Sequence, residues 1–445
     1  MSDTGSGVPR GSSTLQERSL KAVWHPCTQM KQHETLPLIP IARGEGVWLY
    51  DFDGKRYLDA IGSWWVNLFG HANPRINDAI RDQLDRLEHV MLAGFTHEPV
   101  VELSERLSNL VSRKLGHCFY SSDGASAVEI ALKMSFHYWR NSGRPGKNCF
   151  ISLQNDYHGE TLGALSVTDV ALFKNTYAPL LRNSAHVPTP DWRYASKGES
   201  PRDYALRAAA ALEAHLAEHH TEIAAFIVEP LVQGAAGMGM YHADYLKLAR
   251  KICDEYQIHL IADEIAVGFG RTGTMFACEQ AGIVPDFLCL AKGLSGGYLP
   301  LSVVMTTNAV YQAFYHDETA MGFLHSHTHA GNALACRAAL ATLDIFEQDR
   351  IIDANRVKAD YLNHAAQPMA SHPKVKNFRN CGMIWAFEVE TKDPAFAGKF
   401  FRAALDQELL LRPLGNTVYF MPPYTINEQE IDLLLAGALC ALDSF

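Results

Sequence analysis

Residues 286–297 read DFLCLAKGLSGG: an apolar stretch, then a lysine, then a turn rich in glycine. The apolar letters predict a buried strand, and Lys292 follows it directly. Burial lowers the pKa of an amine and frees it to attack a carbonyl group. The competing interpretation is a lysine whose stem packs at the strand end while its ammonium group reaches water. The stretch therefore predicts a buried strand with a candidate catalytic lysine at its end.

Working outward from this strand, apolar strands alternate with helices along the middle of the chain. Strands are predicted at residues 117–121, 148–153, 224–228, 259–262, 286–290 and 301–305, and helices at 126–138, 204–219 and 245–255. Such alternation is typical of a largely parallel sheet with helices on both faces. The predicted fold class is therefore α/β, with the sheet in a large domain.

The two ends of the chain have a different pattern of predicted strands and helices. Two alternating stretches around Asp53-Gly54 predict a β-hairpin over residues 44–59, and residues 71–115 have helical periodicity. After Gly331 the prediction is a long helix to residue 365, strands at 375–378, 383–389 and 418–421, and helices at 396–408 and from 428. We expect both ends to form one small α+β domain from residues 15–62 and 336–445, beside a large domain at 63–335.

Residues 1–14 are left out of this domain scheme. They are rich in Gly and Ser, which predicts disorder, and their VPRGS string resembles a protease-site scar left by an expression tag. They contain no apolar core of a secretory signal. The chain also has no uncharged apolar stretch near the ~20 residues that a membrane span needs. We therefore expect neither secretion nor a membrane anchor.

Charge and cysteine usage narrow the class of protein. The formal net charge is -10, and no dense run of Lys and Arg offers a nucleic-acid surface. The nine cysteines are scattered and form no C-x-x-C pair, which disfavours a disulfide framework. These features predict a cytoplasmic protein that acts on small molecules.

Polar residues at the ends of the apolar strands are the next candidates, since such sheets bind ligands at the carboxyl ends of their strands. Asp263 ends HLIA and needs a partner, either a protonated pyridine nitrogen or a cation such as Arg271. Gly124, in the turn 122–126, would let a phosphate approach the first N–H groups of a helix, although a capped turn needs the same residues. Tyr157 could stack on a flat ring or cover the core.

Two further patterns predict other chemistry less strongly. Gly268, Gly270 and Gly273 match the dinucleotide fingerprint G-x-G-x-x-G, but no clear helix follows and the motif does not open the first βαβ unit. His325, His327 and His329 alternate, so an extended chain would aim all three to one side as a metal site. The flanking residues indicate a loop instead, and no metal is expected.

Five motifs span most of the chain. They are SSDGASAVEIALK (121–133), YHGET (157–161), VEPLVQGAAGM (228–238), ADEIAVGFGRTG (262–273) and LAKGLSGG (290–297). Their combination and order resemble the class III aminotransferases of pyridoxal-phosphate fold type I. The resemblance implies a homodimer with shared active sites, and pyridoxal 5'-phosphate as the cofactor.

The resemblance also implies a role for each matching residue. Lys292 would hold the cofactor covalently and then shuttle protons, Asp263 would pair with the pyridine nitrogen, and Tyr157 would stack on the ring; these three form the catalytic set. The implied cofactor-binding residues are Gly124, Ala125, Tyr157, His158, Glu229, Asp263, Lys292 and, from the partner subunit, Thr328.

Four more motifs narrow the resemblance within the class: WHPCTQM (24–30), GSWWVNLFGH (62–71), HSHT (325–328) and RPLGNTVYFMPPY (412–424). They resemble the branch that moves an amino group from S-adenosylmethionine to 8-amino-7-oxononanoate, giving 7,8-diaminononanoate in biotin synthesis. The implied substrate-binding residues are Trp64, Trp65, Arg271, Ser326, Arg412 and Tyr419. Of these, Arg412 suits a carboxylate because its fork binds both oxygens.

Three departures from the pattern leave the amino donor open between S-adenosylmethionine and lysine. Cys27 stands where some members have a substrate-contacting tyrosine, Ser326-His327 replaces a Gly-Pro, and Asp123 replaces a small hydroxyl residue. The alternative functions are a class III aminotransferase for ω-amino acids, an NAD-dependent dehydrogenase using the turn at Gly268, and a catalytically silent binding protein. The Trp64-Trp65 pair and the intact Lys292 disfavour the first and the last.

Overall fold

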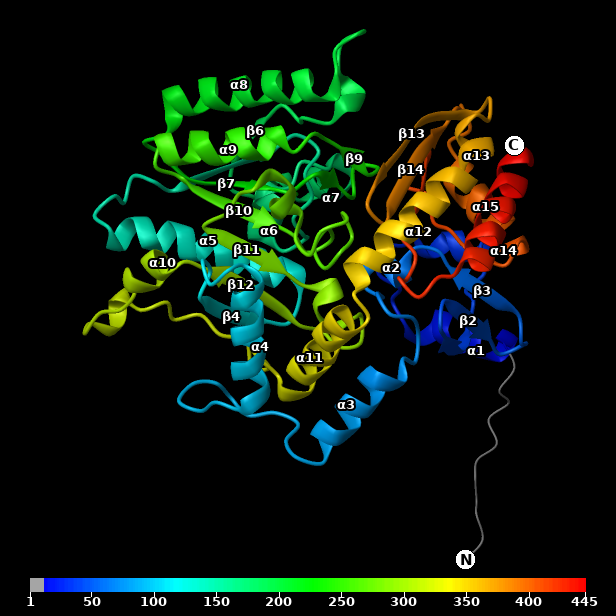
Figure 1. The fold of residues 1–445 in the computed structure, drawn as a ribbon, viewed down its shortest axis with the longest axis horizontal. Helices are drawn as coiled ribbons and strands as arrows, with labels where there is room; N and C mark the ends of the chain where they lie inside the picture. The colour runs from blue at the N-terminus through cyan, green and yellow to red at the C-terminus, as the bar shows by residue number, and fades with distance from the viewer. Residues whose placement is uncertain (1–11) are drawn as a thin grey trace, which may run out of the picture.

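The computed structural model describes residues 12–445. The prediction for residues 1–14 falls mostly outside this range, although helix α1 (Ser12–Ala22) begins at the first described residue. Figure 1 shows two parts, a larger one around a broad sheet and a smaller one that contains both the earliest strands and the C-terminal helix.

The large part is built on a seven-stranded sheet of order β4-β12-β11-β10-β7-β5-β6. Its strands are β4 (His117–Ser121), β5 (Cys149–Leu153), β6 (Ala185–Val187), β7 (Ile223–Val228), β10 (His259–Asp263), β11 (Phe287–Leu290) and β12 (Ser302–Thr306). All pairings are parallel except those of β12, which is antiparallel to both of its neighbours. The predicted, largely parallel α/β sheet is confirmed, and β6 is a strand that the sequence reading missed.

Helices cover both faces of this sheet because its strands are apolar on both sides. In β10, Ile261 joins the hydrophobic cluster under α5, whereas Leu260 and Ala262 join the cluster on the opposite face. This alternation is the two-residue period of a strand. The covering helices are α5 (Gly124–Asn141) and α6 (Leu162–Val167) on one face, and α8 (Pro201–His219), α9 (Asp244–Glu255) and α11 (Ala333–Gln348) on the other.

Residues 71–115, which we predicted to be helical, form two helices. The prediction was wrong for the residues that separate them. They are α3 (Pro74–Leu84) and α4 (Glu98–Leu110), each with a proline in its first turn. Asn73 and His97 cap them by accepting hydrogen bonds from main-chain N–H groups. Proline is tolerated at a helix start but not in its interior, so each proline marks a new beginning.

The helix predicted from Gly331 to residue 365 is also divided. It consists of α11 and α12 (Ile351–Ala365), and Arg350 between them has a left-handed φ of 48°. Because α11 packs on α3 and α4, this break is a second position for the domain boundary that we predicted at residue 335. The predicted domain boundaries near residues 62 and 335 stay predictions.

The small part joins the two ends of the chain. Strands β1 (Ile41–Glu45), β2 (Trp48–Asp51) and β3 (Arg56–Asp59) form the predicted hairpin with one extra strand, and β3 pairs in parallel with β15 (Leu409–Leu410). A second sheet contains β13 (Val375–Cys381), β14 (Ile384–Val389) and β16 (Thr417–Phe420). The helices α14 (Phe396–Asp406) and α15 (Glu428–Asp443) pack on β15 of the first sheet. In Figure 1 the blue strands lie beside the red and orange helices.

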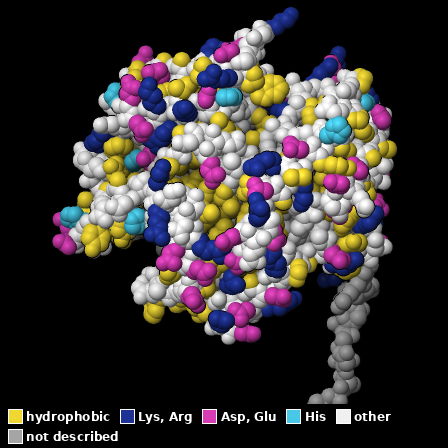
Figure 2. Space-filling view, in the orientation of Figure 1, with side chains coloured by type: hydrophobic (Ala, Val, Ile, Leu, Met, Phe, Trp, Pro, Cys, Tyr) yellow, Lys and Arg dark blue, Asp and Glu magenta, His cyan; other side chains and the backbone are white. Residues whose placement is uncertain are grey.

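The remaining elements are short. They are α2 (Gly62–Trp65), α7 (Ala171–Lys174), α10 (Asn308–Gln312), α13 (Gln367–Ala370) and the strand pair β8 (Val232–Gln233) and β9 (Gly239–Met240). Among the helices of residues 12–445, none has the length and apolar character to cross a membrane. On the face drawn in Figure 2, Lys and Arg side chains are interspersed with Asp and Glu.

Replacing Leu58 tests the junction of the two chain ends. Leu58 of β3 is fully buried opposite Leu409, so Leu58→Ala should lower the free energy of unfolding by about 2–5 kcal/mol through lost burial and a residual cavity. Denaturant titration followed by circular dichroism measures this loss. The control is Leu180→Ala, whose side chain is 65% exposed and should change stability little. Equal effects of the two substitutions would contradict the packing described.

Candidate active site

A cavity of about 990 Å³ opens at the carboxyl ends of the parallel strands. Five strands deliver lining residues at or shortly after their ends: Ser122 after β4, Tyr157 in the loop after β5, Glu229 after β7, Asp263 at the end of β10 and Lys292 after β11. This is the edge at which the sequence reading expected a ligand. The strand ends therefore bring together residues that lie up to 170 positions apart in the chain.

Lys292 is half-buried at this edge, and its side chain lines the cavity. Its main chain has a left-handed φ of 44° and starts a 3-10 turn, Lys292–Ser295. Burial lowers the pKa of Lys292 to about 8, against the opposing charges of Asp263 and Glu229. Nζ lies 4.4 Å from the centre of the Trp65 ring, and within residues 12–445 no hydrogen bond joins it. The amine is thus available to a ligand, as a nucleophile needs to be.

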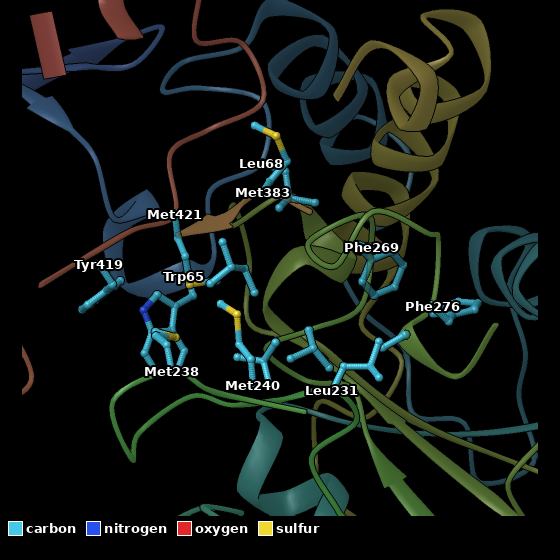
Figure 3. Close-up of a cluster of buried hydrophobic side chains, with 14 of the residues drawn as sticks. Trp65, Leu68, Leu231, Met238, Met240, Phe269, Phe276, Met383, Tyr419 and Met421 are labelled. Atoms are coloured by element: carbon cyan, nitrogen blue, oxygen red, sulfur yellow. The ribbon is translucent and has the colours of Figure 1, made fainter. Parts of the chain in front are cut away.

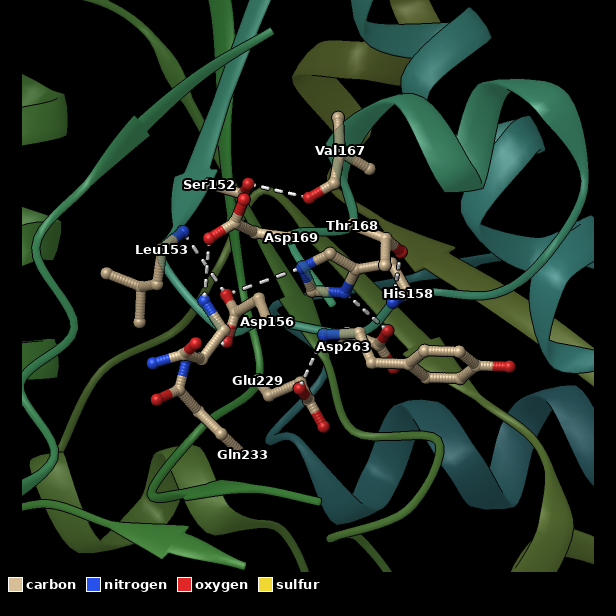
Figure 4. A network of polar contacts seen from close by, with 12 residues as sticks. Ser152, Leu153, Asp156, His158, Val167, Thr168, Asp169, Glu229, Gln233 and Asp263 are labelled. Atoms are coloured by element: carbon tan, nitrogen blue, oxygen red, sulfur yellow. Dashed lines mark hydrogen bonds and ion pairs between the residues drawn. The ribbon is translucent and has the colours of Figure 1, made fainter. Parts of the chain in front are cut away.

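Asp263 has a histidine as its partner. The Nδ1 atom of His158 lies 2.8 Å from Oδ2 of Asp263, and its Nε2 atom lies 3.4 Å from Oδ2 of Asp156 (Figure 4). Burial alone would lower the pKa of His158, but the two carboxylates outweigh it and raise that pKa to about 10. His158 is therefore a buried imidazolium between two carboxylates, and it holds the carboxylate of Asp263 in place at the cavity. The salt bridge to Arg271 that we considered for Asp263 does not form.

Glu229 closes the same network from β7. Its Oε1 atom accepts a hydrogen bond from the main-chain N–H of Tyr157 (2.8 Å), and its Oε2 atom accepts one from Gly234 (3.0 Å). Burial, followed by the charge of Asp156, raises the pKa of Glu229 to about 8. The side chain fixes the backbone of the loop that carries Tyr157, as Figure 4 shows.

The N-terminus of α5 points its first N–H groups toward the cavity. Asp123 caps the helix by accepting from Ser126 N (2.9 Å) and Ser126 Oγ (2.8 Å), so its carboxylate is occupied. The N–H groups of Gly124 and Ala125 precede the hydrogen-bonded part of the helix and are free to bind an anion. A side chain at Gly124 would come within 2.9 Å of Ile265, so glycine is required for this close packing.

Tyr157 and Phe173 form an aromatic wall. Their ring centres are 5.2 Å apart, and the Tyr157 hydroxyl donates a hydrogen bond to Glu160 Oε1 (2.9 Å). Burial is the main reason that the pKa of Tyr157 lies above its usual range. Tyr157 is therefore a protonated, partly exposed ring on the cavity wall, which suits the stacking role expected of it.

Trp64, Trp65 and Arg412 lie together at another side of the cavity. Trp65 is buried against Tyr419, with ring centres 6.1 Å apart, whereas Trp64 is 41% exposed. The Arg412 guanidinium lies 4.8 Å from the Trp64 ring centre and donates a hydrogen bond to the carbonyl of Cys27 (3.2 Å). Both tryptophans and Cys27 line the cavity, whereas Arg412 does not line it and contacts it only through Trp64 and Cys27. Tyr419 acts behind Trp65 and does not line the cavity.

The expectation that Arg271 faces the substrate pocket was wrong. Its side chain is 1% exposed and donates hydrogen bonds to three main-chain carbonyls, those of Asn67 (2.9 Å), Met421 (3.3 Å) and Pro422 (2.7 Å). Its guanidinium also lies over the Tyr424 ring. These carbonyls engage both terminal nitrogens of the guanidinium, and Nε is buried without a partner among the described residues.

The remaining predicted residues lie away from this cavity within one chain. Ser326 and Thr328 are exposed, and the Thr328 carbonyl accepts a hydrogen bond from His89 (2.9 Å). His325 and His327 contact each other (3.1 Å), while the His329 ring packs on His89, so the three histidines do not converge. The motif at Gly268 is a turn without a following helix, which removes the structural context of a dinucleotide site.

Comparison with known proteins identifies the family. A sequence model of the protein family described as aminotransferase class-III matches residues 29–439 of this chain. The chain belongs to the class III aminotransferases. The adenosylmethionine-8-amino-7-oxononanoate aminotransferase of Helicobacter pylori is 48% identical over 438 residues, which cover 96% of this chain and 98% of that protein. The corresponding protein of Geobacter sulfurreducens is 40% identical and covers 96% of each chain.

Solved structures of class III aminotransferases have the same fold. The adenosylmethionine-8-amino-7-oxononanoate aminotransferase of Methanocaldococcus jannaschii superposes with a TM-score of 0.91 at 35% identity, covering 98% of this chain and 99% of that chain. The omega transaminase of Pseudomonas jessenii in complex with PMP gives 0.92 at 31% identity, covering 97% and 98%. The predicted fold, with a mostly parallel sheet and a smaller sheet built in part from the C-terminal segment, is confirmed.

Class III aminotransferases use pyridoxal phosphate, and the cavity fits that cofactor. The unpartnered amine of Lys292 suits its aldehyde, the carboxylate of Asp263 suits its pyridine nitrogen, and the free N–H groups at Gly124 suit its phosphate.

Sequence reasoning missed several residues of the cavity wall. They are Pro26, Phe173, Arg193, Ile265, Tyr298 and Leu414. Ile265 could have been found, since it follows Asp263 by two positions in the same turn. The others come from loops whose path depends on tertiary packing.

Replacing His158 tests the buried charge network. At pH 6.5, His158→Gln should lower the free energy of unfolding by about 3–5 kcal/mol, because two buried carboxylates lose their cation. The imidazole deprotonates near pH 6.5 in the unfolded chain and near pH 10 when folded, so its contribution is complete below pH 6.5 and fades as the pH rises toward 10. Urea titrations at several pH values measure the difference.

The matched control for this variant is His219→Gln on the exposed side of α8. The gap in stability between wild type and His158→Gln should narrow from pH 6.5 to pH 9, while His219→Gln stays near wild type throughout. A gap that widens with pH would show that His158 is neutral in the folded protein.

Proposed function

We propose that this aminotransferase moves an amino group from S-adenosylmethionine through pyridoxal phosphate to 8-amino-7-oxononanoate, giving 7,8-diaminononanoate. The observation that carries the proposal is the full-length identity of 48% to a protein named for that reaction. It is supported by a cavity in which a half-buried free amine, a buried carboxylate and two tryptophans meet. Biotin synthesis is the process in which this reaction belongs.

Each residue at the strand ends has a proposed task. When bound, pyridoxal phosphate supplies an electron-withdrawing ring that stabilises the charge left when a proton leaves the carbon bearing the amino group. Asp263, held by His158, would keep the pyridine nitrogen protonated. Gly124 and Ala125 would bind the phosphate, and Tyr157 and Ile265 would confine the ring. His158 holds Asp263 in place, and Glu229 holds the loop of Tyr157.

Lys292 is proposed to move the proton in each half of the reaction. Once its amine is released, it must take a proton from one carbon and return it to another. Burial lowers the pKa of Lys292 to about 8, which places an appreciable fraction of the amine in its neutral, basic form near neutral pH. An exposed lysine, with its usual pKa above 10, would be almost wholly protonated.

The wall of Trp64, Trp65 and Arg412 is proposed to receive both substrates in turn. An indole face packs against methylene groups and also attracts a cation, so it suits both the aliphatic ketone and a sulfonium. The exposed guanidinium of Arg412 has a single main-chain partner and can turn to a carboxylate in a bidentate pair. Lysine remains the alternative amino donor, since Cys27 widens this side of the cavity relative to an aromatic residue.

A homodimer is part of the proposal. Ser326 and Thr328 are exposed and lie away from the cavity of their own chain, as expected of residues that complete the site of a partner subunit. The nine cysteines are all free, which supports a reducing compartment, the cytoplasm. A second candidate function is amine transfer by an ω-transaminase, because solved omega transaminases superpose equally well. A screen of both donors and of simple ketones separates the two.

Removing the Lys292 amine is the most direct test of the reaction. Lys292→Ala should lower turnover at least 1,000-fold, while cofactor still binds through phosphate and ring contacts. Coupled assays of 7,8-diaminononanoate measure turnover, and the absorbance of dialysed protein measures bound cofactor. Lys251→Ala, an exposed lysine on α9, serves as the control. Near-normal turnover in Lys292→Ala would refute an aminotransferase mechanism at this site.

Replacing Arg412 tests how the two substrates share the cavity. Arg412→Lys should weaken the ketone half-reaction by about 1.5–3 kcal/mol, because a lysine cannot form the bidentate pair with the ketone carboxylate. The donor half-reaction should change less. Single-turnover absorbance changes follow each half separately. Equal slowing of both would mean that Arg412 holds both carboxylates or supports the fold.

A further inference from the structure

The segment that carries the two cavity tryptophans has an unusual backbone. Gly62, Ser63, Trp64 and Trp65 have consecutive φ values of 55°, 45°, 69° and 75°. The N–H groups of Trp65 and Val66 donate to the carbonyls four residues earlier, those of Ile61 and Gly62, both at 2.9 Å. This is one turn of left-handed helix, a conformation that residues other than glycine avoid. Something outside the turn must hold it.

The turn determines where both indoles lie. Trp64 faces the solvent side of the cavity under Arg412, and Trp65 is directed inward, with Lys292 Nζ 4.4 Å from its ring centre. Figure 3 shows Trp65 seated among Met238, Tyr419 and Met421. In a right-handed turn the side chains would leave the backbone in other directions, so these contacts depend on the left-handed one.

Asp59, at the end of β3, holds the turn by its side chain. The carboxylate is fully buried; its Oδ1 atom accepts from Ser63 N (2.9 Å), and its Oδ2 atom accepts from Ser63 Oγ (2.7 Å). It thus binds both donors of the first non-glycine residue with a left-handed backbone. Its own main chain is fixed as well, since Asp59 N donates to Val47 O (2.8 Å).

His71 ties Asp59 to the far end of the same segment. Its Nε2 atom lies 3.0 Å from Asp59 Oδ2, and its Nδ1 atom lies 3.2 Å from Asn67 Nδ2. A neutral imidazole with its proton on Nε2 satisfies both contacts, since it donates to the carboxylate and accepts from the amide. The chain from Asp59 to His71 is thereby closed into a loop around the tryptophans.

We propose that Asp59 and Ser63 are positioning residues for the substrate wall. Neither lines the cavity. They act by fixing the left-handed turn, which sets the separation of the Trp64 and Trp65 faces and so the fit of the long ketone. The identity of the substrate in this inference rests on the proposed function. The dependence of the left-handed turn on Asp59 does not rest on it.

The test compares Asp59→Asn and Ser63→Ala with Asp53→Asn, an exposed aspartate in the β2–β3 turn. Asparagine offers a donor where Oδ2 accepts, so it loses at least one of the contacts to Ser63 Oγ and His71. We expect KM for 8-amino-7-oxononanoate to rise at least 10-fold in both variants, with cofactor occupancy unchanged. The near-UV circular dichroism of the tryptophans should also change, and Asp53→Asn should match wild type in all three measurements.

A third variant, Ser63→Gly, separates positioning from backbone strain. It removes the hydroxyl but leaves the main-chain N–H for Asp59 Oδ1, and glycine adopts a positive φ freely. Its KM should therefore rise less than that of Ser63→Ala. If Asp59→Asn yields no folded protein, the KM, the cofactor occupancy and the near-UV spectrum of Ser63→Ala and Ser63→Gly test the positioning role instead.

The possible outcomes bear on two claims, the positioning role of Asp59 and the proposed function. An unchanged KM together with an unchanged near-UV spectrum in Asp59→Asn would overturn the positioning role, as would a lower melting temperature and smaller active fraction at unaltered KM. A wild-type enzyme that fails to convert 8-amino-7-oxononanoate would overturn the proposed function instead. The spectrum needs no substrate, so a changed spectrum would still support the role of Asp59 in the turn.

Discussion

Burial of charge at the carboxyl edge of the large sheet is the constraint on which the site depends. An isolated ammonium or carboxylate is costly in an apolar interior, and here the buried carboxylates of Asp263, Glu229 and Asp156 lie at the same edge of the sheet as the half-buried amine of Lys292. His158 lies between Asp263 and Asp156 and contacts both carboxylates. The amine of Lys292 has no such partner among the described residues, which supports the nucleophilic role that we propose for it.

Hydrogen bonds fix two of the segments that follow strands at this edge. Glu229, after β7, accepts a hydrogen bond from the main-chain N–H of Tyr157 in the loop after β5, and Asp123, after β4, caps the start of α5. The small part of the molecule also contributes to the cavity wall, through Pro26, Cys27, Glu388 and the residues from Leu414 to Thr417. The cavity is therefore lined by residues of both parts.

The sequence predicted the large sheet well because strand and helix periods differ clearly there. It missed the helix ends at Leu84 and at Gln348, where the apolar period does not change. The helices around the first break each begin with a proline in the first turn, and a single left-handed residue, Arg350, marks the second break. Strand-end logic found Lys292, Asp263 and Tyr157, since adjacency to an apolar run is visible in one dimension. Arg271 was misplaced because its three carbonyl partners lie 150 or more positions away, which no local pattern reveals.

The pairing of β3 with β15 has a consequence for synthesis of the chain. Arg56 at the start of β3 contacts Glu408, 352 residues later, next to β15. A chain leaving the ribosome exposes the first hairpin, with its edge unpaired, until nearly all of the remaining residues have been translated. The central sheet, whose strands end at Thr306, can assemble in the meantime. During that interval the N-terminal strands offer an open β-edge to other nascent chains, so binding by a chaperone would be most useful there.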